Sequence, residues 1–132
     1  MLKYPAEILL AFGEAIDGQK TFLDWLMKNG YPELGALATA VRGSEEAFLW
    51  LMKNGYPDLA ALDSAIDGRE KAYHWLKQHG YSFYIVFADA CQGKEPALVW
   101  LKSRDLDIFI RLALKIKKLR ESQYFDYHKL HF

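Results

Sequence analysis

Residues 40–55 read AVRGSEEAFLWLMKNG, and this stretch decides the fold because its pattern recurs along the chain every 25 residues. The pattern is an alanine, a glycine three positions later, a Trp-Leu pair and a second glycine. It is found again in residues 15–30 and 65–80, and residues 90–105 keep all of it except the last glycine. The tryptophans alone show the period: Trp25, Trp50, Trp75 and Trp100. A fixed period of this length is typical of stacked structural repeats.

Each repeat unit is predicted to contain two short helices. In the third unit Pro57 opens the first helix, at a position where its missing N–H costs nothing, and Gly68 ends that helix. The apolar residues between them have the spacing of one helical face. A second helix opens near Glu70, whose charge favours a helix N-terminus, and ends at Gly80. We therefore expect an all-α fold, a right-handed α/α solenoid of about five two-helix repeats.

The 132 residues are predicted to form a single helical-repeat domain. Its repeat units run roughly over residues 4–30, 31–55, 56–80, 81–105 and 106–132. The last unit has Lys118 where the other units have a glycine, so its helix is expected to run on. End units are expected to deviate because one side of them faces water. The aromatic tail is predicted to fold over the last repeat as a cap, with a dimerisation or docking segment as the alternative; its residues are Tyr124, Phe125, Tyr127 and Phe132.

The tryptophans are predicted to be the buried anchors of the array. A lone helix pair of this size cannot hide its apolar face, so stacked neighbours share their cores. Each tryptophan is expected to lie wedged between its own unit and the next. On this interpretation Trp50→Ala would cost about 3–5 kcal/mol, the range for emptying a large buried aromatic site.

The spacing of Ala40, Gly43, the pair Trp50-Leu51 and Gly55 resembles the ankyrin repeat, and more closely a shortened, Trp-Leu-containing ankyrin-like repeat. The resemblance covers residues 11–105. Ankyrin units run to 33 residues and use the additional length for a β-hairpin finger. A unit of 25 residues has no room for this finger, so the fingertip contacts typical of the family are expected to be absent.

Composition and charge restrict the class of protein. The chain is 52% hydrophobic and 15% aromatic, which argues against disorder. The charges balance overall, but residues 1–110 carry 11 basic and 15 acidic side chains and residues 111–132 carry 6 and 2. No apolar run has the length of a membrane span, and the N-terminus lacks the apolar run of a signal peptide. With one cysteine, Cys91, predicted to be a buried small hydrophobe, a cytoplasmic location is expected.

Function is predicted to reside on the columns of the repeat that vary between units. These positions share one face of the first helix of each unit, and a solenoid joins such faces into an extended surface. The face is rich in acidic residues, so it is predicted to bind a basic or polar peptide or protein; an ordinary solvated face is the alternative. The candidate binding residues are Glu14, Asp17, Thr39, Arg42, Asp63, Ser64, Asp67, Asp89 and Gln92.

No constellation of residues in the sequence supports catalysis. The basic stretch from Arg111 to Arg120 suits the end of a helix dipole, with nucleic-acid or phospholipid contact as the weaker reading. Asp126, His128 and His131 are the only cluster that resembles metal ligands. The sequence therefore predicts a non-catalytic protein–protein interaction module without a cofactor, binding neither nucleic acid nor membrane, as a monomer or weak homodimer. The alternatives are a metal-dependent or enzymatic protein using the Asp/His cluster and a self-associating structural repeat protein.

Overall fold

The computed structural model describes the backbone of residues 1–130 and the side chains of residues 1–123. Within this part of the chain all regular structure is α-helical, as predicted, and no strand is formed. The helices are α1 (Ala6–Ile16), α2 (Lys20–Lys28), α3 (Pro32–Val41), α4 (Glu45–Lys53), α5 (Pro57–Ile66), α6 (Glu70–Gln78), α7 (Ser82–Cys91), α8 (Glu95–Ser103) and α9 (Asp107–Leu130). From α3 to α8 the helix starts and ends recur at the 25-residue step of the sequence.

The predicted turn residues end the helices where the pattern places them. Gly43 has a φ of 109°, and its N–H donates to the Ala40 carbonyl at the end of α3. The next residue, Ser44, accepts a hydrogen bond from the Ala47 N–H and so caps the start of α4. Two helices can therefore follow each other after a turn of only three residues, which leaves no length for a β-hairpin finger.

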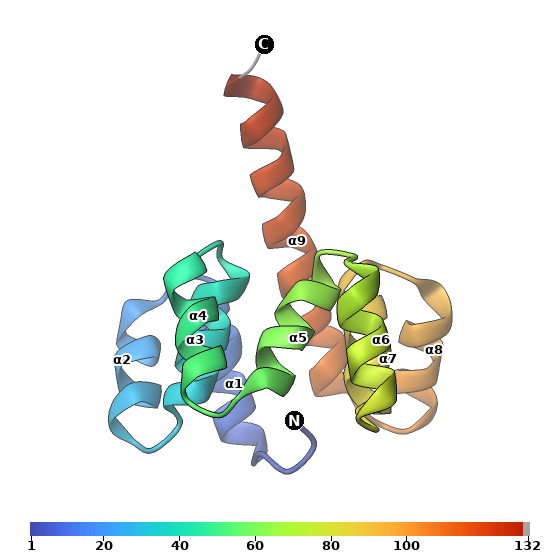
Figure 1. The fold of residues 1–132 in the computed structure, drawn as a ribbon, viewed down its shortest axis with the longest axis horizontal. Helices are drawn as coiled ribbons and strands as arrows, with labels where there is room; N and C mark the ends of the chain where they lie inside the picture. Colours follow the sequence, from blue (N-terminus) through green and yellow to red (C-terminus); the bar gives the residue numbers. More distant parts are fainter. Residues whose placement is uncertain (131–132) are drawn as a thin grey trace.

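The odd-numbered and even-numbered helices form two layers (Figure 1). Each odd-numbered helix packs against the next odd-numbered helix, from α1 through α9, and α9 also packs against α1. These five inner helices thus close into a ring. Each even-numbered helix lies outside this ring and packs against the inner helices before and after it in sequence.

Three columns of the repeat supply the core of the ring. Phe12, Leu37, Leu62, Phe87 and Leu112 form one column, and every member is buried. The columns that start at Leu9 and at Ile16 are buried throughout in the same way. The second of these includes Cys91, so the prediction that this cysteine is a buried small hydrophobe is confirmed.

The prediction that the tryptophans are the buried anchors is wrong. Trp25 is 42% exposed, and the other three tryptophans are only half-buried, whereas the leucine after each tryptophan is fully buried. The Trp50 ring stacks on Tyr56, with 6.1 Å between the ring centroids. Trp75 stacks on Tyr81 in the same way. The leucine therefore points into the core, and the tryptophan covers the junction to the next inner helix from outside.

The fifth unit is not a helix pair like the other units, and its helix runs on as predicted. It contains a single long helix, α9, because Lys118 stands where a glycine stops the other inner helices. The backbone stays helical to Leu130 and rises beyond the turns of the ring, so it does not turn back over the last repeat as a cap (Figure 1). The side chains of the tail aromatics lie outside the described residues.

Candidate functional site

Four acidic residues of the predicted binding face are in contact with α9, and the fifth, Asp89, pairs with Lys94. Lys115 forms an ion pair with Asp17, and its Nζ lies 4.0 Å from a carboxylate oxygen of Glu14. Arg120 forms an ion pair with Asp67, and its Nη2 lies 3.5 Å from Oδ1 of Asp63. The basic stretch and the acidic face, which the sequence suggested as separate features, are therefore partners within one chain.

This contact also covers the ends of the inner helices. Asp17, Arg42 and Asp67 cap the C-termini of α1, α3 and α5, where unpaired carbonyls carry partial negative charge. The amide of Gln123 donates to the Arg42 carbonyl at 3.0 Å, and Lys117 lies against Gly93 at the end of α7. One segment of α9, residues 115–123, thus reaches the C-terminal ends of all four preceding inner helices with positive or hydrogen-bond-donating groups.

Asp63 is the one acidic residue in an otherwise small-residue column. Its counterparts are Gly13, Ala38, Ala88 and Ala113, all buried, and Asp63 itself is 7% exposed. Burial raises the pKa of the Asp63 carboxyl above its ordinary value of 3.8, and the charge of Arg120, followed by that of Arg69, acts in the opposite direction. Burial likewise lowers the pKa of Arg120, which Asp63 raises. The pair joins α9 to α5 through the inside of the ring.

The remaining residues of the predicted face also bond within the chain. Arg42 donates to the Ile16 carbonyl at 2.8 Å, and Thr39 donates to the Gly35 carbonyl at 2.8 Å. Gln92 donates to the Ala65 carbonyl at 2.9 Å, and Asp89 accepts a hydrogen bond from the Tyr73 hydroxyl at 2.8 Å. The bonds of Arg42, Gln92 and Asp89 join different helices, and that of Thr39 lies within α3, so these positions of the variable columns have structural roles.

The candidate chemical groups form no reactive centre in the described part of the chain. Burial raises the pKa of the Cys91 thiol well above its ordinary value of 9.0, so the reactive thiolate is disfavoured. Among the described residues no three His, Cys, Asp or Glu side chains lie together as a metal site would require. The predicted cluster of Asp126, His128 and His131 lies outside the residues whose side chains are described.

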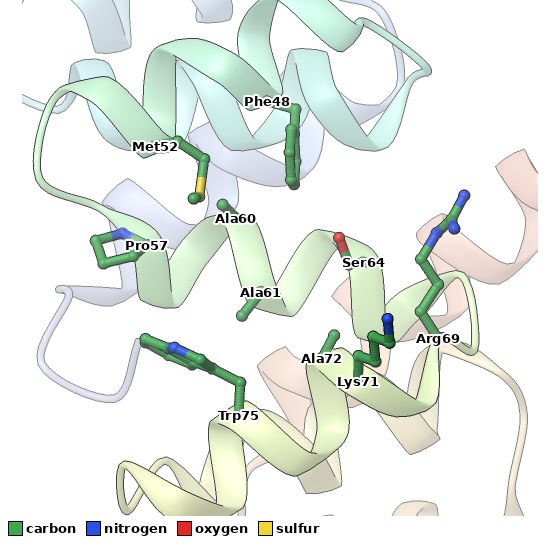
Figure 2. Close-up of a pocket in the computed structure, with 10 residues that line it drawn as sticks. All are labelled: Phe48, Met52, Pro57, Ala60, Ala61, Ser64, Arg69, Lys71, Ala72 and Trp75. Carbon is green, nitrogen blue, oxygen red and sulfur yellow. The ribbon is translucent and has the colours of Figure 1, made fainter.

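Two equivalent grooves open on the outer layer. The first groove lies between α2 and α4, and the second groove lies between α4 and α6 (Figure 2). The floor of the first is formed by Gly35, Ala36 and Thr39 of α3, and its walls include Leu23, Met27 and Trp50. The floor of the second is formed by Ala60, Ala61 and Ser64 of α5, and its walls include Phe48, Met52 and Trp75. Each of these residues stands 25 positions after its counterpart.

Each groove continues toward the turns that end the inner helices. A further hollow above the first groove shares Leu23, Thr39 and Ser44 with it, and one above the second shares Phe48, Ser64 and Arg69. The lower parts, nearer the tryptophans, have volumes of about 400 Å³ in the first groove and about 250 Å³ in the second. The molecule therefore offers the same apolar hollow twice, on either side of α4.

The corresponding position between α6 and α8 has larger side chains. Ile85 and Val86 take the places of Ala60 and Ala61 on the floor and pack against the core. Tyr73 takes the place of Phe48, and its hydroxyl accepts a hydrogen bond from Gln92 at 2.8 Å as well as donating to Asp89. The grooves thus depend on small floor residues that the chain has in its second and third units and lacks in its fourth.

The residues in the walls of the grooves also change along the chain, from apolar to charged. Met27 is 48% exposed and Met52 is 51% exposed, and at the equivalent positions of α6 and α8 the chain has Lys77 and Lys102. Leu49, on the outer side of α4 between the two grooves, is also exposed. Methionine and aromatic side chains are enriched in protein interfaces and lysine is depleted. Exposed apolar side chains therefore line both open grooves, and others lie elsewhere on the chain, at Leu10, Val99 and Leu114.

No protein-family model, no curated protein and no solved structure matches this chain. The described helices also include none with both the length and the apolar character needed to cross a bilayer. The candidate site therefore depends on the geometry of the chain itself. The grooves were not predicted from the sequence, although two columns of the repeat indicate them. The floor column increases in size from Gly35 and Ala60 to Ile85, and the wall column changes from apolar to charged, from Met27 and Met52 to Lys77.

Proposed function

We propose that this chain is a non-catalytic protein–protein interaction module and that it binds its partner through the first and second grooves. The observation that carries the proposal is that one apolar hollow is formed twice from equivalent residues, whereas the third position has the larger side chains of Ile85, Val86 and Tyr73. Stability alone gives no reason for small floor residues in two units, since the chain itself has larger ones at the equivalent positions of a third.

The proposed binding surface lies on the outer layer of helices, and not on the face of the inner helices that was predicted from the sequence. The acidic face of the inner helices pairs with Lys115 and Arg120 of α9, so a basic partner would have to displace a segment of this chain. The grooves need no such displacement. Binding there removes exposed apolar surface such as Met27 and Met52 from water, which is the main favourable term in most protein association.

We also propose a wider setting for the module. The 25-residue recurrence of helix bounds supports a helical-repeat array with the character of a solenoid, related in arrangement to short ankyrin-like repeats and closed by α9. The single buried cysteine suits a reducing compartment such as the cytoplasm. The proposal assigns the chain no cofactor and no reaction.

A peptide-display selection against the whole chain tests the proposal. Clones that bind the natural chain are tested again on two groove-filled variants, Ala36→Val with Met27→Lys and Ala61→Val with Met52→Lys. These variants carry residues that the chain itself has at Val86 and Lys77, so they are compatible with the fold. The matched control is Val99→Lys, which adds a charge at an exposed position of α8 away from both grooves.

The expected result is that selected clones lose binding to at least one groove-filled variant and keep binding to the control. Clones that bind both groove-filled variants as tightly as the natural chain would place the binding surface elsewhere and would contradict the proposal. Circular dichroism of each variant shows whether the helical fold is retained.

A further inference from the structure

The two grooves differ in charge although their apolar surfaces are equivalent. Glu46 and Lys71 stand at the same repeat position, beside the first and second groove respectively. The other charged residue lining the first groove is Asp24, and the other one lining the lower second groove is Arg69. Among the described residues no ion pair involves Glu46, Lys71 or Asp24. The lower part of the first groove thus has an acidic rim and the lower part of the second has a basic rim, whereas the hollows above them are lined by residues of the opposite charge, such as Lys20 and Glu45.

On the basis of the proposed function, we infer that the occupant is an amphipathic α-helix of a partner protein. This helix lies across α4 and inserts one apolar side chain into each groove. It carries a basic residue beside the side chain in the first groove and an acidic residue beside the side chain in the second groove.

The size of the lower part of each groove suits an inserted side chain better than a whole helix. Two turns of an α-helix about 10 Å in diameter occupy roughly 800 Å³. The lower parts of the grooves measure about 400 Å³ and about 250 Å³, which suits inserted side chains. The helix itself must then lie outside, over Leu49 and Met52, which are both exposed on α4.

The separation of the grooves selects the spacing of the inserted side chains. The grooves are separated by one helix, α4, and a helix with its side chains is about 10–12 Å wide. Positions i and i+7 of an α-helix lie on the same face about 10.5 Å apart. An extended strand presents same-face residues about 6.7 or 13.4 Å apart, and neither distance matches.

The lining of the grooves favours a helix over a proline-rich segment. Such a segment has same-face residues about 9.3 Å apart, but its backbone makes no internal hydrogen bonds and requires donors from its partner or from water. The floors consist mainly of glycine and alanine, and the Thr39 hydroxyl already donates to the Gly35 carbonyl. An α-helix satisfies its own backbone and therefore suits an apolar floor.

The test uses helical peptides with two leucines at positions i and i+7 on an alanine–glutamine background, labelled for fluorescence anisotropy. A peptide can bind in either direction, so reversing its sequence would not test the charges. Three peptides are compared instead: one with a lysine beside one leucine and a glutamate beside the other, one with two lysines and one with two glutamates. Further peptides have leucines at i and i+4 only, or a proline-rich sequence.

The natural chain is expected to bind the lysine–glutamate peptide at least about fivefold more tightly than either like-charged peptide. Lys71→Glu leaves Arg69 beside a new carboxylate, so the second rim has no net charge and the preference for the lysine–glutamate peptide over the two-lysine peptide should disappear. Glu46→Lys leaves Asp24 beside a new ammonium, so the preference over the two-glutamate peptide should disappear. The control Val99→Lys should leave the order unchanged.

An order of peptide affinities that neither substitution changes would overturn the inference, as would equal or tighter binding of the i, i+4 or proline-rich peptides. Absence of binding by all the i, i+7 peptides would overturn it too. If sedimentation of the chain alone shows a dimer that Glu46→Lys dissociates, the occupant is a second copy and the inference is wrong. None of these results contradicts the proposed function. That proposal is contradicted only if the selected display clones bind the groove-filled variants as tightly as they bind the natural chain.

Discussion

Arg120→Ala tests the ionic contact between α9 and the end of α5. The substitution removes the guanidinium beside Asp63 and leaves a carboxylate that is 7% exposed with Arg69 as its remaining cation. Breaking a buried ion pair by removing one partner typically costs 3–5 kcal/mol. Because the Arg120 side chain is 27% exposed, the expected loss lies below this range, at about 2–3 kcal/mol. Urea denaturation followed by circular dichroism measures the loss.

A second variant separates the ion pair from the packing of α9. Asp63→Ala restores the residue type of the equivalent positions Ala38 and Ala88 and leaves Arg120 paired with Asp67, so it should cost about 1 kcal/mol or less. In the double variant no buried charge is left unpaired. We expect the double variant to regain about 1–2 kcal/mol relative to Arg120→Ala alone.

The pH dependence gives an independent check. The pKa of Asp63 in the folded chain is raised above its ordinary value of 3.8, and loss of Arg120 removes the largest opposing charge. The folded state then binds the Asp63 proton more tightly than the unfolded state does, so stability falls as the pH rises through the folded pKa. The cost of Arg120→Ala should therefore be larger at pH 7 than near pH 4. A cost below about 0.5 kcal/mol at pH 7, without recovery in the double variant, would refute the reasoning.

Three further predictions concern the core, the thiol and the Tyr73 hydroxyl. Leu51→Ala should lower the free energy of unfolding by about 2–5 kcal/mol, and Trp50→Ala should lower it by less, because Leu51 is fully buried and Trp50 is only half-buried. Urea denaturation measures both losses, and the reverse order would show that the tryptophan is the anchor. Cys91 should react with a thiol reagent at pH 8 only when the chain unfolds, and rapid labelling of the folded chain would contradict its burial. The stability of the fold should also decrease as the pH rises above 9, because the folded state retains the thiol proton that the unfolded state loses. Tyr73→Phe should cost about 1 kcal/mol through its hydrogen bonds to Asp89 and Gln92, and an unchanged urea midpoint would show that these bonds contribute nothing.

The sequence predicts the local structure of this chain well. Residues such as Pro57, Gly43 and Gly68 act through the backbone conformations they favour, and these conformations depend little on distant parts of the chain. The helix bounds and the all-helical class follow from them. The buried columns follow as well, because residues at equivalent positions of a repeat meet equivalent surroundings.

Ring closure could not be predicted by comparing the repeat units, because it joins residues that stand at different positions of the repeat. Lys115 and Arg120 belong to the last unit, and their partners Asp17 and Asp67 belong to the first and third units. Comparison of columns cannot reveal such pairs. The one signal was the charge asymmetry, with the acidic excess in residues 1–110 and the basic excess in residues 111–132.

The tryptophans show a second limit. Their recurrence in the first four units suggested burial, but a residue can recur because it covers the same junction from outside. Trp50 and Trp75 do this by stacking on Tyr56 and Tyr81, the tyrosines just before the next inner helices. The grooves were missed for a related reason. They depend on small floor residues such as Ala36, Ala60 and Ala61, and the recurrence of a residue type does not show where a small residue leaves a hollow.

Backbone NMR of the chain during titration with the lysine–glutamate i, i+7 peptide tests the central claim most directly. If the helix binds across α4, the largest changes in amide chemical shift on adding peptide are expected at Gly35, Ala36, Ala60, Ala61 and the outer side of α4. Little change is expected at Asp17, Asp67 or residues 115–123 of α9. Shifts centred on α9 and its acidic partners, with the groove floors unchanged, would contradict this claim.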